Sequence, residues 1–295
     1  MSLLKLPKAY HPDFALPNKK PVGGSLVDLD HPLAPTHGFF TFPSPGVMIN
    51  HVNGNIYNST GSGGIVRGGY YYDTSGSNHR FVNSSSSPSV NYFETEIDYP
   101  LSTLTAIADL KLDLLGVNEY SQIITRGGLF VNNTNFVFGL RIGATAATRS
   151  IVLYSRSSGG TLSGNEFDVT LSTTERMTAG TVFEVDGKIQ TYKDGALVNT
   201  DTGNTLYAGG TQKVRVGAST GATSSERGFE GGVSWVYLSE TPLTPSQVKS
   251  ITDNPYQILK PKNNLYYWTA GGAAPSGFQP AWAIHANKLI NMVQY

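Results

Sequence analysis

The chain of 295 residues contains no cysteine, and only 14% of its residues are charged. Without cysteine there is no disulfide scaffold and no thiolate metal site, which fits a protein that folds in a reducing cytoplasm. Lysine and arginine together number 21, as do aspartate and glutamate. The net charge of zero therefore gives no sign of nucleic acid or an anionic membrane as a partner.

Long apolar segments are also missing. No apolar run approaches the roughly 18 residues that a helix needs to cross a bilayer. Lys5, Pro7 and Lys8 interrupt the first residues, so we expect no secretory signal there. The sequence predicts neither a membrane-spanning nor an exported protein.

Short alternating segments fill most of the chain instead. Leu110, Leu112 and Leu114 alternate with polar residues, and the segments QIITRGGLF, NFVFGLRIG and SIVLYSRS follow, each bounded by Gly, Asn or Ser. A spacing of about 8–12 residues between such segments is typical of a β-sandwich.

The clearest local signals lie between Thr181 and Leu259. Asp186-Gly187 and Asp194-Gly195 interrupt alternating runs and predict tight hairpins, because both turn residues can take positive φ. The strand Lys188–Lys193 should place Ile189 and Tyr192 on opposite faces. Further along, KVRVGAS predicts a strand with Val214 and Val216 inward, and FEGGVSWVYLS an aromatic-rich strand.

A short helix follows, and its start can be read residue by residue. Thr244 suits the N-cap, Pro245 the first helical position and Gln247 the third, which makes a capping box. Leu243 and Val248 form a hydrophobic staple across that start. The helix should end before Pro255, since the residue preceding a proline is pushed out of the α region.

The order of these elements resembles the C-terminal half of laminin-G-like (concanavalin A-like) jelly-roll domains. More narrowly, it is similar to the versions carried by tailed-bacteriophage virion proteins. The phrase Asn254-Pro255-Tyr256-Gln257-Ile258 after the helix matches theirs, as do NKKPVGG and the segment Asp28–Ala34 near the start. The resemblance implies an all-β jelly-roll sandwich over residues 36–259, with a short C-terminal helix. Extended arms are expected over residues 1–35 and 260–295.

Both expected arms carry candidate docking residues. Prolines in the first arm prevent ladder hydrogen bonds and favour an extended segment, with a disordered tail as the alternative. The second arm is too apolar for a solvated tail, so we expect it to be buried on this subunit, its copies or a carrier surface. The candidate docking residues are Pro7, Pro12, Pro17, Pro21, Trp282, Ile284, Leu289 and Ile290.

One phrase resembles a catalytic motif. Glycoside hydrolases on this jelly-roll scaffold use an E-x-D-x-x-E strand, and Glu96-Ile97-Asp98 matches its beginning, with Glu94, Glu96 and Asp98 expected on one face. Retaining hydrolysis needs two carboxyl groups about 5–5.5 Å apart. The second glutamate of the motif is missing and Pro100 interrupts the strand. We therefore expect no enzyme, and the sequence also lacks a nucleophile elbow and a Walker-type loop.

No metal site or cofactor is expected. Some laminin-G-like domains bind calcium at the rim of the sandwich, where Asp73, Asp113 or Asp201 could contribute oxygens, but their spacing is not diagnostic. A sugar site would need aromatic faces beside polar partners. The candidate glycan-binding residues are Tyr70, Tyr71, Tyr72, Asp73, Asn78 and His79. The alternative is a tyrosine-rich strand at a sheet edge or subunit contact.

The resemblance implies a non-enzymatic bacteriophage virion structural protein, made in the host cytoplasm and located in the virion. Within that class we expect a capsid decoration protein whose arms dock on other virion proteins, the major capsid protein first, as a homo-oligomer or in a lattice. The alternative is a tail fibre or baseplate adhesin that recognises host surface glycan. A polysaccharide depolymerase is the third reading.

Overall fold

A computed structural model of the protein describes thirteen stretches of the chain. These are residues 25–42, 47–60, 71–72, 79–81, 92–97, 103–112, 120–126, 138–144, 149–156, 162–169, 176–204, 213–217 and 231–261. Among them, no helix is long and apolar enough to cross a membrane.

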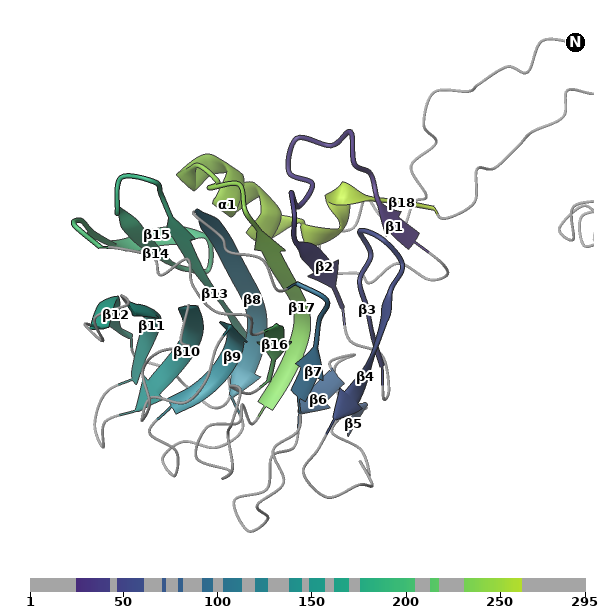
Figure 1. The fold of residues 1–295 in the computed structure, drawn as a ribbon, viewed down its shortest axis with the longest axis horizontal. Helices are drawn as coiled ribbons and strands as arrows, with labels where there is room; N and C mark the ends of the chain where they lie inside the picture. The colour runs from purple at the N-terminus through teal and green to yellow at the C-terminus, as the bar shows by residue number, and fades with distance from the viewer. Residues whose placement is uncertain are drawn as a thin grey trace, which may run out of the picture. The chain divides into compact units, whose positions relative to one another are not determined.

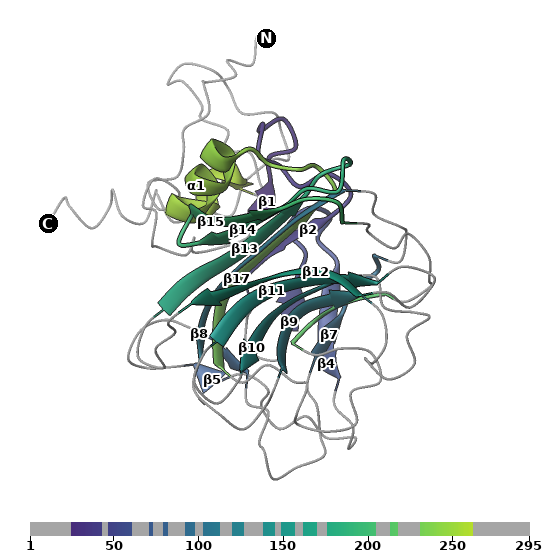
Figure 2. The same ribbon diagram turned by 90° about the vertical axis from the view of Figure 1, so that its left-hand side faces the viewer.

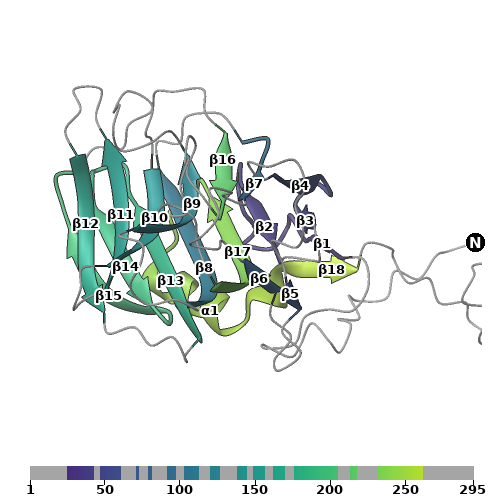
Figure 3. The same cartoon turned by 90° about the horizontal axis from the view of Figure 1, so that it is seen from below.

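Two large antiparallel sheets form the sandwich (Figures 1 and 3). The first sheet runs, in spatial order, β12 (Leu162–Val169), β11 (Arg149–Arg156), β10 (Phe138–Ala144), β9 (Tyr120–Arg126), β16 (Val214–Val216), β7 (Tyr92–Glu94), β4 (Ile56–Thr60) and β3 (Val47–Ile49). The second runs β15 (Ala196–Asp201), β14 (Ile189–Lys193), β13 (Arg176–Phe183), β8 (Leu104–Leu112), β17 (Gly231–Ser239), β6 (His79–Phe81) and β5 (Tyr71–Tyr72), and β2 (Phe39–Thr41) pairs with the end of β17. The predicted all-β sandwich is confirmed.

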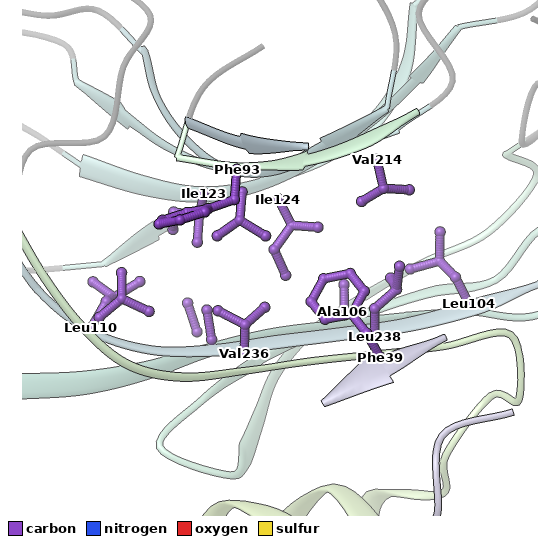
Figure 4. Packing of buried hydrophobic residues seen from close by; sticks show 14 of the residues in the cluster. Phe39, Phe93, Leu104, Ala106, Leu110, Ile123, Ile124, Val214, Val236 and Leu238 are labelled. Atoms are coloured by element: carbon purple, nitrogen blue, oxygen red, sulfur yellow. The ribbon is translucent and has the colours of Figure 1, made fainter. Parts of the chain in front are cut away.

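The main core lies between the two sheets (Figure 4). In β8, Leu104, Ala106, Ala108 and Leu110 point into it, as the alternation of a strand requires. Residues from both sheets meet there, with Phe39, Phe93, Leu104, Ala106, Leu110, Ile123, Ile124, Val214, Val236 and Leu238 labelled in Figure 4. The predicted inward positions of Val214 and Val216 are confirmed.

A bulge in β17 decides what lies on the outer face of the second sheet. Val233 pairs with Leu110, but the next paired residue, Trp235, is opposite Asp109, so Ser234 is the extra residue. Because the bulge reverses the alternation, Val233 and Val236 face the main core while Trp235 and Tyr237 face outward.

A second core covers that outer face. The helix α1 (Pro245–Asp253) and the 3₁₀ helix η3 (Pro255–Ile258) pack over it, and Figure 2 shows α1 against this sheet. Its members are Val27, Leu33, Phe40, Phe42, Ile107, Val182, Tyr192, Trp235, Tyr237, Leu243, Val248, Ile251, Tyr256, Ile258 and Leu259. The predicted capping box is confirmed: Thr244 N donates to Gln247 Oε1 at 2.9 Å, and Gln247 N to Thr244 Oγ1 at 3.4 Å.

The tight hairpin predicted at Asp194-Gly195 is confirmed, because these two residues join β14 to β15 with φ of 52° and 75°. At Asp186-Gly187 a hairpin also forms, but residues 184–188 separate β13 from β14, and only Gly187 takes positive φ there, at 82°. A Cβ on Gly187 would approach the carbonyl oxygen of Asn204 to 2.3 Å, so glycine is required there for space as well as for φ.

A third, two-stranded sheet joins segments from near the two ends of the chain. β1 (Ser25–Val27) pairs antiparallel with β18 (Leu259–Pro261), and Ser25 lies opposite Pro261. On its other side, β1 is held by His51, whose Nδ1 donates to the carbonyl of Ser25 at 2.9 Å. Residues 25–35 had been expected within an extended arm, yet Val27 and Leu33 are buried in the second core.

Candidate functional site

The predicted glycan residues lie at an edge of the second sheet where the structure describes them. β5 and β6 pair so that Tyr72 is opposite His79 and Tyr71 is opposite Arg80. Tyr70, Asp73 and Asn78 lie outside the described residues. The backbone thus brings two of the six predicted residues directly opposite each other.

The predicted docking residues lie outside the described ranges. This holds for the four prolines before residue 25 and for the four apolar residues after residue 281. Their role stays a prediction.

The structure reveals a polar cluster that the sequence did not single out. Its centre is the Glu96 carboxylate, at the rim of the sandwich after β7. Asn53 Nδ2 donates to Glu96 Oε1 at 2.7 Å, and Asn50 Nδ2 donates to the same oxygen at 3.3 Å. The Tyr57 hydroxyl donates to Glu96 Oε2 and accepts from Asn50 Nδ2 at 3.1 Å. We call these four residues the rim cluster.

A tight turn between β3 and β4 positions the amides of the rim cluster. Asn50 Oδ1 accepts from Val52 N at 3.0 Å, and Asn53 Oδ1 accepts from Asn55 N at 2.9 Å. Gly54 closes the turn with φ of 83° and donates its N–H to the carbonyl of Asn50 at 2.7 Å. Asparagine favours such turns because its side chain bonds to nearby backbone N–H groups, and glycine favours them because it allows positive φ.

Glu96 reaches the rim because the β7 ladder ends just before it. Thr95 N donates to the carbonyl of Val214 at 2.9 Å, but Val214 N donates to the carbonyl of Ile97 at 2.8 Å. In a regular antiparallel ladder Val214 N would donate to Thr95, but here it donates to Ile97, so Glu96 lies outside the ladder. As a result Glu94 and Glu96, expected on one strand face, bind different partners.

The charge state of Glu96 argues against an acid role. Burial raises its pKa, but hydrogen bonds from Tyr57, Asn53, the backbone of Glu96 itself and Asn50 outweigh burial, and the pKa lies below its ordinary value. A general acid needs a raised pKa, so that it holds a proton near neutral pH. Glu96 is instead a fixed hydrogen-bond acceptor.

A second polar group lies on the outer face of the first sheet. Arg215 on β16 donates to Glu94 Oε2 from Nε at 2.9 Å and from a terminal nitrogen at 2.7 Å. Its guanidinium also lies 4.0 Å from the centre of the Tyr92 ring. These side chains face outward because Phe93, Val214 and Val216 face the core. We call Tyr92, Glu94 and Arg215 the open-face group.

Within the described stretches, no three His, Asp or Glu side chains lie close enough together to hold a metal ion such as calcium. Asp201 serves a turn, since its carboxylate accepts from Thr202 N at 2.9 Å and from Asn204 Nδ2 at 3.2 Å. Asp73 and Asp113 lie outside the described residues.

An ion pair joins the buried Asp109 on β8 to the more exposed Arg176 on β13. Arg176 Nε donates to Asp109 Oδ1 at 2.8 Å and to Oδ2 at 2.6 Å, and a terminal nitrogen also bonds Oδ2. Burial raises the pKa of Asp109, while the bond and charge of Arg176 act to lower it. Asp109 lies opposite the β17 bulge, so this pair is structural.

Comparisons with known proteins identify the fold. No protein-family model matches the chain, and no curated protein matches its sequence. The binding domain of Paraclostridial Mosquitocidal Protein 1 aligns with a TM-score of 0.52 and 10% identity, over 72% of this chain and 51% of that one. A botulinum neurotoxin type C structure gives 0.51 and 8%, over 74% and 51%. The ligand binding domain of botulinum neurotoxin serotype D, in complex with N-acetylneuraminic acid, gives 0.50 and 12%, over 73% and 50%.

This chain spans about half the length of those three structures. At such low identity the likeness shows the fold alone, a lectin-like jelly-roll sandwich. The named parts of the mosquitocidal protein and the serotype D toxin are binding domains.

Proposed function

We propose that this protein is a non-enzymatic virion structural protein of a bacteriophage, a capsid decoration protein that docks through its terminal segments. The observation that carries the proposal is the pairing of β1 with β18. Because the pair is antiparallel and Ser25 lies opposite Pro261, the chain before β1 and the chain after β18 leave the sandwich at the same end of this sheet.

That arrangement suits attachment of the sandwich to another protein through both terminal segments. The sequence has 24 residues before Ser25 and 34 after Pro261 (295 minus 261), and both sets start from neighbouring points. Two segments that start together can bind one partner surface at a high effective concentration, so weak individual contacts suffice. Repetition across a capsid lattice would strengthen the attachment further.

The β1–β18 sheet and its contacts are formed by the segments that carry the resemblance to phage virion proteins. Asp28 N donates to the carbonyl of Ile258 at 2.7 Å, and Lys260 Nζ donates to Asp28 Oδ1 at 3.1 Å. Leu33 shares the second core with Leu243. The two matching segments, far apart in sequence, thus support one structural element.

Co-sedimentation with capsids that lack this protein tests the proposal. The full chain should sediment with the capsids, and deletion of residues 1–24 or of residues 263–295 should abolish or strongly weaken binding. The matched control is Val185→Lys, which changes an exposed residue of a distant hairpin and should bind normally. Equal binding by full and shortened chains, or no binding by either, would overturn the docking proposal.

A second candidate is a tail or baseplate adhesin that holds host glycan. Two observations favour it. One is the fold shared with toxin binding domains, since cell entry of the type C toxin depends on two ganglioside molecules and the serotype D domain was solved with N-acetylneuraminic acid. The other is the rim cluster, which offers a fixed acceptor at an exposed position.

A further inference from the structure

We propose that Glu96 and Asn53 form a binding site for adjacent hydroxyl groups of a neutral glycan. The inference rests on the second candidate function, glycan binding, and gives that function a site and a ligand class. The three observations behind it are the exposed position of the pair, the rigidity of its support and the negative charge of Glu96 without an ion-pair partner among the described residues.

The pair presents a carboxylate and an amide N–H at an exposed position. Oε1 of Glu96 accepts from Asn53 and Asn50, Oε2 accepts from Tyr57, and the backbone of Glu96 also bonds the carboxylate. Asn53 Nδ2 uses one N–H on Glu96, and both residues are exposed. An acceptor and a donor therefore lie side by side at the surface.

Adjacent sugar hydroxyls match such a pair. One hydroxyl can donate to the exposed carboxylate of Glu96, and its neighbour can accept from the second N–H of Asn53. Hydrogen bonds to an ionised group are stronger than neutral ones. The lowered pKa of Glu96 keeps the carboxylate charged throughout the neutral and mildly acidic range.

The support beneath the pair is rigid. Asn50 is fully buried and Tyr57 is buried in the main core, and both bond Glu96 from below the rim. The turn glycine Gly54 is not crowded, because a Cβ there would meet only a Leu26 methyl at 4.0 Å. A site held in its binding geometry loses little entropy when a ligand arrives.

The charge of the site selects the ligand. Glu96 forms no ion pair within the described stretches. Its carboxylate should therefore repel sialic acids and uronic acids. The open-face group is a poorer candidate, since Arg215 and Glu94 already satisfy each other.

The test is binding of the full chain to an array of neutral oligosaccharides, hexose and N-acetylhexosamine, beside their sialylated and uronate counterparts. Neutral glycans should bind and acidic ones should not. Asn53→Ala and Glu96→Gln should each weaken binding about tenfold or more, since each removes a bond involving a charged group. Asn53 is exposed, so Asn53→Ala keeps the test valid if Glu96→Gln misfolds, and thermal unfolding of each variant checks this.

The control is Glu184→Gln, which neutralises another surface carboxylate, the partner of Lys188, and should bind as the parent does. Neutral glycan binding that survives Asn53→Ala would overturn the site and leave glycan binding standing. Binding of acidic glycans alone would overturn the ligand class and with it the site. Absence of binding to every probe would overturn both the site and the adhesin function.

Discussion

The outer faces of the two sheets differ, although both are built by the same alternation of residues. On the second sheet, Trp235 and Tyr237 point outward and are covered by α1, η3 and the segment after β1. On the first sheet, the outward residues Tyr92, Glu94 and Arg215 are partly exposed, and no described element covers them (Figures 1 and 2).

The difference shows that the two outer faces contribute differently to stability. The covered face is packed by segments from near both chain ends, and this packing stabilises the fold. The terminal segments leave the sandwich beside it. The uncovered face carries the polar side chains of Tyr92, Glu94 and Arg215, which lie outside both cores, so they can change with little loss of core packing. We therefore expect large stability effects on the covered face and small ones on the uncovered side.

The largest effect should come from Trp235→Ala on the covered face. Trp235 is fully buried in the second core, and removing its ring should cost about 3–5 kcal/mol of unfolding free energy, through lost burial and a cavity. Urea unfolding measures this. The control Val185→Ala, at a position 84% exposed, should change stability by less than about 0.5 kcal/mol. A loss below about 1 kcal/mol for Trp235→Ala would contradict the claim that the covered face contributes more to stability than the uncovered face.

Arg176→Ala should have the next largest effect, because it leaves the Asp109 carboxylate buried without its cation. A buried pair loses about 3–5 kcal/mol when broken, and the 41% exposure of the Arg176 side chain reduces this to about 2–3 kcal/mol. Urea unfolding at neutral pH measures it. The exposed Lys249–Asp253 pair is the control, and Lys249→Ala should cost at most about 0.5 kcal/mol.

The pH dependence of the Arg176→Ala loss follows from the pKa of Asp109. Burial already raises this pKa above the unfolded value of 3.8, and without Arg176 it rises further. A raised folded pKa means stability that is present at low pH and lost as pH rises through the folded pKa. The Arg176→Ala loss should therefore be largest near neutral pH and shrink in acid. A loss that is constant with pH would mean that Asp109 is not the cause.

Arg215→Ala, on the uncovered face, should cost less than about 1 kcal/mol. The ion pair with Glu94 and the contact with the Tyr92 ring are both partly solvated, and such interactions contribute little. The same urea unfolding experiment applies. A loss as large as that of Arg176→Ala would show that the two faces do not differ in this way.

The smallest effect should appear at the rim cluster, as a pH dependence. Hydrogen bonds lower the pKa of Glu96 below the unfolded value of 4.5. A lowered folded pKa means stability that is present above pH 4.5 and lost as pH falls through the folded pKa. Unfolding free energy measured from pH 7 to pH 3 should fall less steeply for Tyr57→Phe than for the parent chain. Identical profiles would contradict the hydrogen-bonded state of Glu96.

Local signals in the sequence predicted local structure well. The Thr244 cap, the Asp194-Gly195 turn and the opposite faces of Ile189 and Tyr192 depend on neighbouring residues alone, and all are confirmed. The β-sandwich also followed from the regular spacing of many short strands, and the resemblance to laminin-G-like domains implied the jelly roll.

Features that depend on distant partners could not be read in advance. The alternation of Glu94, Glu96 and Asp98 predicts one strand face, but β7 ends at Glu94 because Val214 bonds Ile97 instead of continuing the ladder. The β17 bulge is likewise decided across the sheet, opposite Asp109. The rim cluster joins the β3–β4 turn to Glu96. The sequence drew attention to Glu96 through its resemblance to a catalytic phrase, and the Asn53-Gly54 turn signal could have drawn attention to the turn, but nothing in the sequence connects the two.

The central claim is that the terminal segments dock while the rim stays free. Hydrogen–deuterium exchange of the full chain, alone and bound to capsids that lack it, tests this most directly. We predict slower exchange on binding in residues 1–24 and 262–295, with no change in residues 50–57. Slower exchange in residues 50–57 with unchanged terminal segments would contradict the claim and make the rim the docking surface.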